Sequence, residues 1–416
     1  MNDIEQARAD LLRCFQAGVA RVEGRSVVAD YLRQQPIDGE CSLVAVGKAA
    51  QSMALGAAEV LGDRLVDGLV ISKREHLDRN RLSGLRLEGI EGGHPLPDAG
   101  SLEAGRRLLG YLSGLPDGRP MLFLISGGSS SLLEVLQGGL GLDQLQAVNR
   151  WLLGSGLAIH DINEVRRRLS RIKGGGLRQL LQKHPVTALL ISDVAGDDPA
   201  VVGSGLLVPP GVQNSDLERH LPQWIRALLC PLEVTALELP DLEISIEIVA
   251  SLQDARQAAA EEGARLGYPV QLNRAPIDAA AETAGRRLAL ELADSRPGLY
   301  VWGGEPTVVL PENPGRGGRN QHLALAAATV IEGRDDVCFL SAGTDGSDGP
   351  GEDAGALVDG GTLGRARRQG YDAGECLRRA DAGTLLAASG DLIHTGPTGT
   401  NVTDLILGIH LDSGRP

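Results

Sequence analysis

The chain has 416 residues, which is too long for a single ordinary hydrophobic core. This length favours two domains. Its formal net charge of −14 argues against duplex nucleic acid or an anionic membrane as a partner, although backbone N–H groups and a few cations could still bind phosphate locally. The five cysteines are scattered without a C-x-x-C pair, so a reducing compartment fits better than a disulfide or structural zinc framework.

The chain begins with MNDIEQARADLLRCF, which is charged and helical in pattern. It lacks the apolar segment of a signal peptide, and no stretch is long enough to span a membrane. We therefore expect a cytoplasmic protein without a membrane or nucleic-acid partner.

In chain order, the first half alternates apolar strands with helices. A helix is expected at 3–18, another from about 49 and a third after the loop 92–101, capped by Asp98 or Ser101. Further helices are expected at 129–136 and within 143–172, where Asp161 would cap the last one and the glycines at 174–176 would stop it. Strands are expected at 42–46, 68–72, 121–126 and 187–192. This alternation implies βαβ crossovers and a mostly parallel, doubly wound sheet.

The second half of the sequence has a different pattern of predicted elements. An amphipathic helix at 217–228 leads to a Pro-flanked connection, which places the domain boundary near 230–240 and predicts domains 1–235 and 236–416. An alternating, half-exposed strand at 242–249 would open the second domain. The elements expected after it are helices at 253–266, 279–292 and 321–331, and strands at 299–302, 307–310 and 337–341.

Three apolar strands end abruptly in Gly, Ser and Asp, in the segments 122–131, 189–205 and 339–349. Ligands of open α/β sheets lie beyond the carboxyl ends of the strands, where glycine allows close approach and N–H groups can face an anion. The pattern predicts an enzyme whose phosphate and metal site is assembled from distant loops.

Cations stand beside two of the glycine-rich turns. Lys48 follows Gly47 at a strand end and precedes a helix, but Ala49 takes the place of the Ser or Thr of a P-loop. Arg316 and Arg319 lie on the loop GRGGRNQ, where guanidinium groups could grip phosphate or carboxylate. A solvated surface lysine and a solvated basic loop are the alternatives.

Acids occupy the ends of two of these strands. Asp193, Asp197 and Asp198 follow one strand, and Asp345 and Asp348 follow another, which suits magnesium held together with substrate phosphates. Each of these acids taken alone is more typical of a turn or helix cap. Glu305, in a Gly-Gly-Glu-Pro turn, is either a base or hydroxyl acceptor or a surface turn residue.

Two further stretches are less specific. The cations from Arg166 to Lys173 complement the dipole at the end of a helix, while the Gly/Thr-rich segment 395–403 is typical of a ligand-facing loop. No G-x-S-x-G motif accompanies the serines at 129–131, which argues against a serine hydrolase.

Taken together, nine blocks of the sequence, in order from about residue 5 to the end, resemble the class II glycerate 2-kinases, whose C-terminal part is the MOFRL domain. The blocks are VGKAA, GGHPLPDAGS, LISGGSSSLLE, INEVRRRLSRIKGGGL, ISDVAGDDP, GGEPTV, GRGGRNQ, SAGTDGSDGP and TGPTGTNVTDL. The resemblance implies an N-terminal doubly wound Rossmann-like parallel sheet and a C-terminal α/β MOFRL-type domain, with the active site in the cleft between them. It also implies ATP- and Mg²⁺-dependent conversion of D-glycerate to 2-phosphoglycerate by a monomer or homodimer.

By this resemblance Lys48 and Arg319 are catalytic, and Asp193 and Asp345 are the expected metal ligands. The positions expected to bind substrate or nucleotide are Gly47, Ser126, Gly127, Gly128, Ser129, Arg166, Lys173, Glu305, Asn320, Thr344 and Asn401. The chain departs from the family pattern at Ser129, His322 and Ser347, which bears on substrate preference.

Two other functions stay open at this point. An NAD(P)H-dependent hydroxypyruvate reductase, a label that many such proteins carry, would want a G-x-G-x-x-G turn after a strand, and the sequence has none. A non-catalytic sugar-phosphate sensor would not need Lys48, Arg319 and several acids together.

Overall fold

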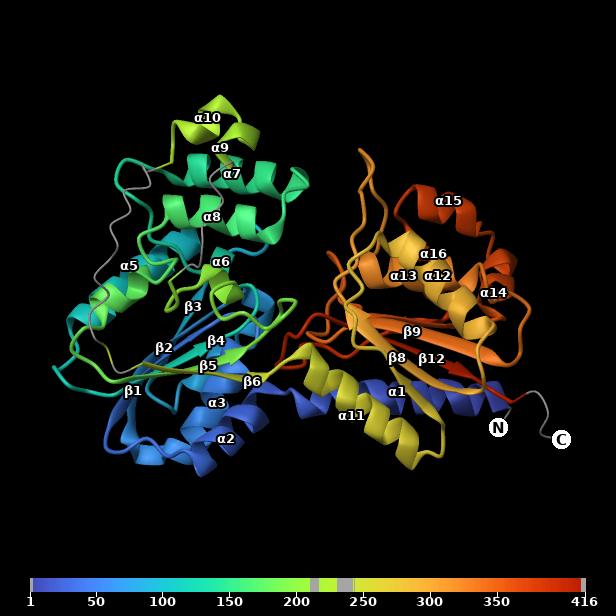
Figure 1. The fold of residues 1–416 in the computed structure, drawn as a ribbon, viewed down its shortest axis with the longest axis horizontal. Helices are drawn as coiled ribbons and strands as arrows, with labels where there is room; N and C mark the ends of the chain where they lie inside the picture. Colours follow the sequence, from blue (N-terminus) through green and yellow to red (C-terminus); the bar gives the residue numbers. More distant parts are fainter. Residues whose placement is uncertain (1–2, 210–216, 230–241, 243, 413–416) are drawn as a thin grey trace. The chain divides into compact units, whose positions relative to one another are not determined.

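The computed structural model describes residues 3–209, 217–229, 242 and 244–412, which form two compact α/β units (Figure 1). One unit runs from Gly24 to Ala250. The other joins the N-terminal helix, up to Glu23, to the chain from Ser251 onward. Each unit contains a six-stranded sheet covered by helices, which confirms the expected two-domain α/β class. The predicted boundary between residues 235 and 236 lies outside the described residues, as does Cys230.

The sheet of the Gly24–Ala250 unit has the strand order β3-β2-β1-β4-β5-β6, and all neighbouring strands are parallel. β1 and β4 are buried along their whole length, as their sequences, apolar apart from Ser42, favour. This order is that of a doubly wound dinucleotide-type sheet, so the prediction of a Rossmann-like parallel sheet is confirmed. The strands are β1 (Cys41–Val46), β2 (Leu65–Ser72), β3 (Leu87–Glu91), β4 (Met121–Ile125), β5 (Val186–Ile191) and β6 (Ile244–Ala250).

Helices cover both faces of this sheet, with α2 and α3 on one side and α5 and α6 on the other (Figure 1). Asp98 caps α5 by accepting a bond from the Ser101 N–H at 3.0 Å, and Ser101 Oγ accepts one from the Asp98 N–H at 3.1 Å, so both predicted capping residues take part. The helices are α2 (Gly24–Gln34), α3 (Ala50–Leu61), α4 (Arg79–Leu82), α5 (Ala99–Ser113), α6 (Ser129–Leu132), α7 (Leu142–Gly154), α8 (Ile159–Leu169), α9 (Leu217–His220) and α10 (Gln223–Arg226), with 3₁₀ turns η1 (Gly62–Arg64), η2 (Arg74–His76), η3 (Gly176–Leu180) and η4 (Val202–Ser204).

Three predictions in this unit are wrong in detail. Asp161 lies within the first turn of α8 rather than at its cap, which is Ala158. The single helix predicted at 217–228 is two short helices, because Pro222 stands between them and lacks the N–H that a continuous helix needs.

β6 does not open the second domain but pairs in parallel with β5 at the sheet edge. Its alternating sequence signals half exposure, which the structure confirms, but not the identity of its neighbour.

The sheet of the other unit has the order β11-β10-β9-β12-β8-β7. Neighbours are antiparallel except β7 and β8, so this sheet is mixed. β9 and β12 lie at its centre and are almost wholly buried. The strands are β7 (Val270–Leu272), β8 (Gly298–Gly304), β9 (Val337–Gly343), β10 (Gly355–Asp359), β11 (Leu392–Ile393) and β12 (Asp404–His410).

Figure 1 shows α1 and α11 along one face of this sheet, with α12 and α13 across the other. The segment predicted as a strand at 307–310 is wrong: it forms only an isolated bridge at Thr307, and Val309 is 92% exposed. None of the described helices is long and apolar enough to cross a membrane. The helices of the unit are α1 (Asp3–Arg21), α11 (Leu252–Arg265), α12 (Ala281–Ala293), α13 (Arg319–Ala328), α14 (Thr362–Arg368), α15 (Ala373–Arg378) and α16 (Ala382–Ser389).

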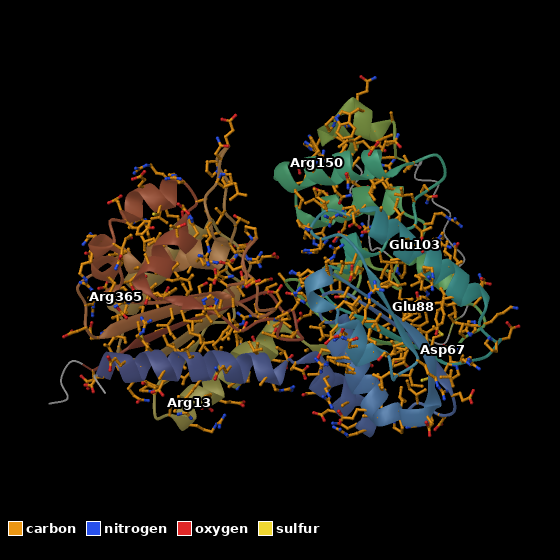
Figure 2. All side chains as sticks on the ribbon, turned by 180° about the vertical axis from the view of Figure 1, so that it is seen from behind. Arg13, Asp67, Glu88, Glu103, Arg150 and Arg365 are labelled. Carbon is orange, nitrogen blue, oxygen red and sulfur yellow. The ribbon has the colours of Figure 1, made fainter. Side chains whose placement is uncertain are left out.

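The N-terminal helix α1 belongs to this unit and not to the one that follows it in sequence. Its buried residues Leu11 and Phe15 pack in one hydrophobic cluster with Leu405 and other residues of the central strands. Arg8 donates to Asp391 at 2.9 Å, and Asp391 also accepts from Arg365, which is labelled in Figure 2, at 2.7 Å. The predicted range 1–235 is therefore corrected, because the apolar face of α1 finds its partners in strands near the end of the chain.

Candidate active site

The turn after β1 is tied to the turn after β4. Gly47 has φ 130°, and a Cβ atom placed there would lie 2.1 Å from Ser126 Oγ, so the close approach requires glycine. The Lys48 N–H donates to the Gly127 carbonyl at 2.9 Å, and the Ala49 N–H donates to Ser126 Oγ at 3.0 Å. The sequence-predicted residues of these two turns therefore form one local structure around the base of Lys48.

The Lys48 side chain and the His94 ring both lie next to Gly128. A Cβ placed on Gly128 would be 3.3 Å from Lys48 Cγ and 3.1 Å from His94 Cδ2. His94 follows β3 in the GGHPLPDAGS loop, while His76 Nδ1 lies 3.0 Å from the Lys48 carbonyl oxygen. Sequence reasoning singled out the loop but not His94, although a loop that follows a parallel strand is where such a side chain would be sought.

Ser129, the third residue of the predicted phosphate loop, faces Gly203. Its Oγ is buried and has no hydrogen-bond partner within the described part of the chain. A Cβ on Gly203, which has φ 59°, would lie 2.4 Å from that oxygen, so glycine makes room for the hydroxyl. A buried orphan hydroxyl costs about 1–3 kcal/mol, which makes a polar ligand at this position favourable.

Arg166 and Lys173 both lie within electrostatic range of one buried carboxylate, that of Glu134, but only Lys173 pairs with it. The Lys173 ammonium pairs with Glu134, and both side chains are almost fully buried. Burial lowers the pKa of Lys173, and Glu134 opposes this shift. Arg166 Nε donates to Asn149 Oδ1 at 3.1 Å, and burial lowers its pKa too. Lys173 thus neutralises the buried Glu134 carboxylate. The binding of substrate or nucleotide by Arg166 and Lys173 stays a prediction.

Arg319 is the first residue of α13 and contacts two carboxylates. Its Nε and Nη2 atoms donate to Asp404 at 2.5 and 3.1 Å, and Nη1 donates to Glu305 at 3.0 Å. Burial tends to lower the pKa of Arg319, but the Asp404 carboxylate outweighs it and the pKa is raised. The guanidinium is therefore a permanent cation, held in place but still 35% exposed.

Asp348 fixes the start of α13. Its carboxylate accepts from the N–H groups of Asn320 at 3.0 Å and Gln321 at 2.8 Å, and Asn320 Oδ1 accepts from Ser341 Oγ at 2.6 Å. Burial raises the pKa of Asp348 to about 6, although these N–H bonds lower it. The sequence indicated Asp348 as a candidate magnesium ligand or as a turn or cap residue, but nothing local links it to a helix 28 residues earlier.

The raised pKa of Asp348 predicts a specific pH dependence of stability. Because the folded pKa lies above the ordinary aspartate pKa of 3.8, the contribution of this group is fully present below pH 3.8 and is lost as the pH rises through about 6. The loss amounts to about 3 kcal/mol at most. Urea unfolding should show that the free energy of unfolding of wild type falls, relative to that of Asp348→Asn, as the pH rises over this range. A difference that stays constant from pH 4 to 7 contradicts the shift.

Thr344, Asp345 and Asn401 lie around the loop that leads into β12. Thr344 Oγ1 donates to the Thr403 carbonyl at 2.6 Å, and Asn401 is 7% exposed. Asp345 Oδ1 accepts from the N–H and hydroxyl of Ser347, at 2.9 and 3.0 Å, so the departure at Ser347 orients this acid.

Asp345 and Asp404 flank one glycine. A Cβ on Gly343 would lie 3.3 Å from Asp345 Oδ1 and 3.5 Å from Asp404 Oδ1. Asp193, the other expected metal ligand, follows β5 and is partly buried. In the described ranges, no three His, Cys, Asp or Glu side chains are arranged to hold a metal ion. Magnesium in kinases commonly uses one or two carboxylates with substrate phosphates, and such a site does not need three.

Most of the predicted residues gather in two places, whereas Arg166, Lys173 and Asp193 lie outside both groups. Lys48 and the turn residues 47 and 126–129 come together in the Gly24–Ala250 unit. Glu305, Arg319 and Asn320 gather at the start of α13 in the other unit, where Thr344, Asp345 and Asn401 surround the end of β9 and the entry to β12. Asp404 was missed, although an acid opening the apolar strand sequence DLILGI was the available signal.

Comparison with known proteins gives matches along most of the chain. Residues 10–231 match the family described as a domain of unknown function, DUF4147, and residues 298–404 match the MOFRL family. A D-glycerate 2-kinase from Thermotoga maritima is 37% identical over 383 residues, covering 88% of this chain and 90% of that protein. A crystal structure of glycerate kinase from Thermotoga maritima matches with a TM-score of 0.82 at 34% identity, covering 98% of this chain and all of that one. A relative from Agrobacterium vitis that carries a hydroxypyruvate reductase name is 35% identical, covering 97% of this chain and 94% of its own length.

Proposed function

The chain belongs to the glycerate kinase family that combines DUF4147 and MOFRL domains, and we propose that Lys48 and Arg319 carry out its reaction. That reaction is the transfer of the γ-phosphoryl group of ATP to the 2-hydroxyl of D-glycerate, giving 2-phosphoglycerate and ADP. The observation that carries the function is the similarity to a D-glycerate 2-kinase over 88% of the chain.

Phosphoryl transfer needs positioning and charge neutralisation more than covalent chemistry from the protein. We assign Lys48 and Arg319 to the transferring phosphoryl group and the glycerate carboxylate, and the backbone of residues 127–129 to phosphate. Glu305, Asn320, Thr344 and Asn401 complete the proposed contacts. Lys48 belongs to the Gly24–Ala250 unit and Arg319 to the other unit.

Magnesium would be held by Asp345 or Asp193 together with phosphate oxygens, and when bound it would neutralise phosphate charge. The fit of Asp345 is supported by its oriented carboxylate beside that of Asp404. On the protein side, Ser347 keeps one oxygen of Asp345 engaged and so fixes the direction of the other.

The geometry disfavours the reductase alternative. The sheet has the dinucleotide-type strand order, but its first βα turn carries Gly47, Lys48 and Ala49 in place of a G-x-G-x-x-G sequence. A lysine side chain lies across Gly128, in the adjoining turn after β4. This arrangement suits a phosphoryl group better than a nicotinamide dinucleotide.

The function is tested by incubating the protein with ATP, MgCl₂ and D-glycerate and identifying the product by ³¹P NMR. We expect the 2-phosphoglycerate resonance to grow with that of ADP, while L-glycerate serves as the control substrate. A product phosphorylated at the 3-hydroxyl would refute the assignment, as would oxidation of NADH by hydroxypyruvate without kinase activity.

A further inference from the structure

Asp404 is a buried acid at the start of an apolar central strand. Its side chain is 1% exposed, and its cross-strand neighbours are Gly304 on β8 and Gly343 on β9. Because neither neighbour has a side chain, the space beside the carboxylate is open to a large partner. That partner is the guanidinium of Arg319, which reaches it from the first turn of α13.

The two carboxylates on Arg319 differ in kind. Asp404 is buried and takes two parallel bonds from Nε and Nη2, whereas Glu305 is 59% exposed and takes one bond from Nη1. A bidentate pair away from water is strong and directional, while an exposed ion pair contributes little. Asp404 therefore sets the plane and direction of the guanidinium.

The backbone next to Arg319 is fixed as well. Asp348 accepts from the N–H groups of Asn320 and Gln321, the two residues that follow Arg319. With the main chain held by one buried acid and the side chain by another, little rotational freedom remains for Arg319. A guanidinium has five N–H groups, and the two that Asp404 takes leave three for Glu305 and a substrate oxygen.

We propose that Asp404 is a positioning residue of the kinase reaction, which holds Arg319 so that the outer N–H groups of its guanidinium face the anionic substrate. The inference rests on the proposed role of Arg319. Asp404 does not touch substrate in this scheme and acts only through the arginine. Its removal should therefore affect the rate only where Arg319 is present.

A double-mutant cycle tests this dependence. Asp404→Asn keeps the size of the side chain and removes its charge, and we expect kcat to fall by about 10- to 100-fold, the scale for loss of a residue that orients a functional group. In the Arg319→Ala background the same change should cost less than about twofold. Wild-type activity in Asp404→Asn, or an equal loss in both backgrounds, would overturn the proposal.

Asp391→Asn is the matched control, because Asp391 is also 1% exposed and pairs with arginines in the same unit. It should lower the melting temperature as Asp404→Asn does, yet keep kcat within about twofold of wild type. Circular dichroism defines the temperature at which all variants are folded for these assays. An equal fall of kcat in both variants would mean that Asp404 is only structural.

Chemical rescue provides a second measurement that does not require the single Asp404 variant to fold. Added guanidinium should restore activity at least about fivefold in Arg319→Ala, where Asp404 can hold the free cation. In Arg319→Ala/Asp404→Asn it should restore none, and equal rescue in both would overturn the proposal. Wild-type protein that makes no 2-phosphoglycerate would overturn the proposed function itself, whereas active wild type with normal Asp404→Asn refutes only this inference.

Discussion

Arg319→Ala is expected to lower kcat/KM for D-glycerate by at least about 100-fold, the usual effect of losing a charged contact to the transition state. Arg319 is a permanent cation oriented by Asp404 and still partly exposed, so its charge is available to an anion. The loss should appear mainly in kcat, measured by coupling ADP formation to NADH oxidation.

Arg316→Ala is the control for the same loop. Arg316 donates to the buried Asp353 at 2.7 Å, and we expect its loss to leave kcat/KM within about threefold. Arg319→Ala also leaves the Asp404 carboxylate buried and unpaired, so its melting temperature should fall. A near-normal rate in folded Arg319→Ala would restore the interpretation of this segment as a solvated basic loop.

Lys48→Ala is expected to lower kcat/KM by a similar factor, at least about 100-fold. Its backbone is held between the turns after β1 and β4, and the stem of its side chain lies over Gly128, so the ammonium is carried on a rigid support. Because the neighbouring backbone bonds do not involve the side chain, the thermal unfolding of Lys48→Ala should change little.

Lys48→Arg and Lys183→Ala sharpen this test. Arginine keeps the charge but differs in shape and hydration, so we expect it to recover only part of the rate. Lys183 is exposed and pairs with an exposed Asp117. Lys183→Ala should therefore leave kcat/KM unchanged in the same assay. Full activity in Lys48→Ala would mean that the turn binds phosphate without the ammonium.

Much of the first sheet could be predicted from the sequence, since its central strands are mainly apolar runs followed by glycine or serine. Errors arose where position depends on distant partners. The half-exposed strand β6 looked like the start of a new domain because its pairing with β5 crosses more than 50 residues of chain. The segment at 307–310 has β-branched residues, but the prolines at 306 and 311 leave it without a ladder to join.

The candidate site likewise contains residues marked by local sequence and residues whose role depends on distant partners. Turn residues such as Lys48 are recognisable because their glycine-rich surroundings are local in the sequence. Asp404 and Asp348 act on α13 from 85 and 28 residues away, and a carboxylate at that separation carries no local mark of its partner. Local sequence therefore suggests candidate substrate contacts more readily than it suggests the distant residues that would hold those candidates in place.

The placement of α1 has a consequence for the order in which the chain can fold during synthesis. The apolar face of α1 leaves the ribosome before the strands of its own unit, and the strands that cover it include β12, which ends at His410. At about 5–20 residues per second this interval is roughly 20–80 s. Before β12 emerges, the Gly24–Ala250 unit already has its full sequence and can fold, while Leu11 and Phe15 still lack the partners that β12 supplies. The packing of α1 is therefore completed only after β12 has been synthesised, and until then part of its apolar face stays without its native cover.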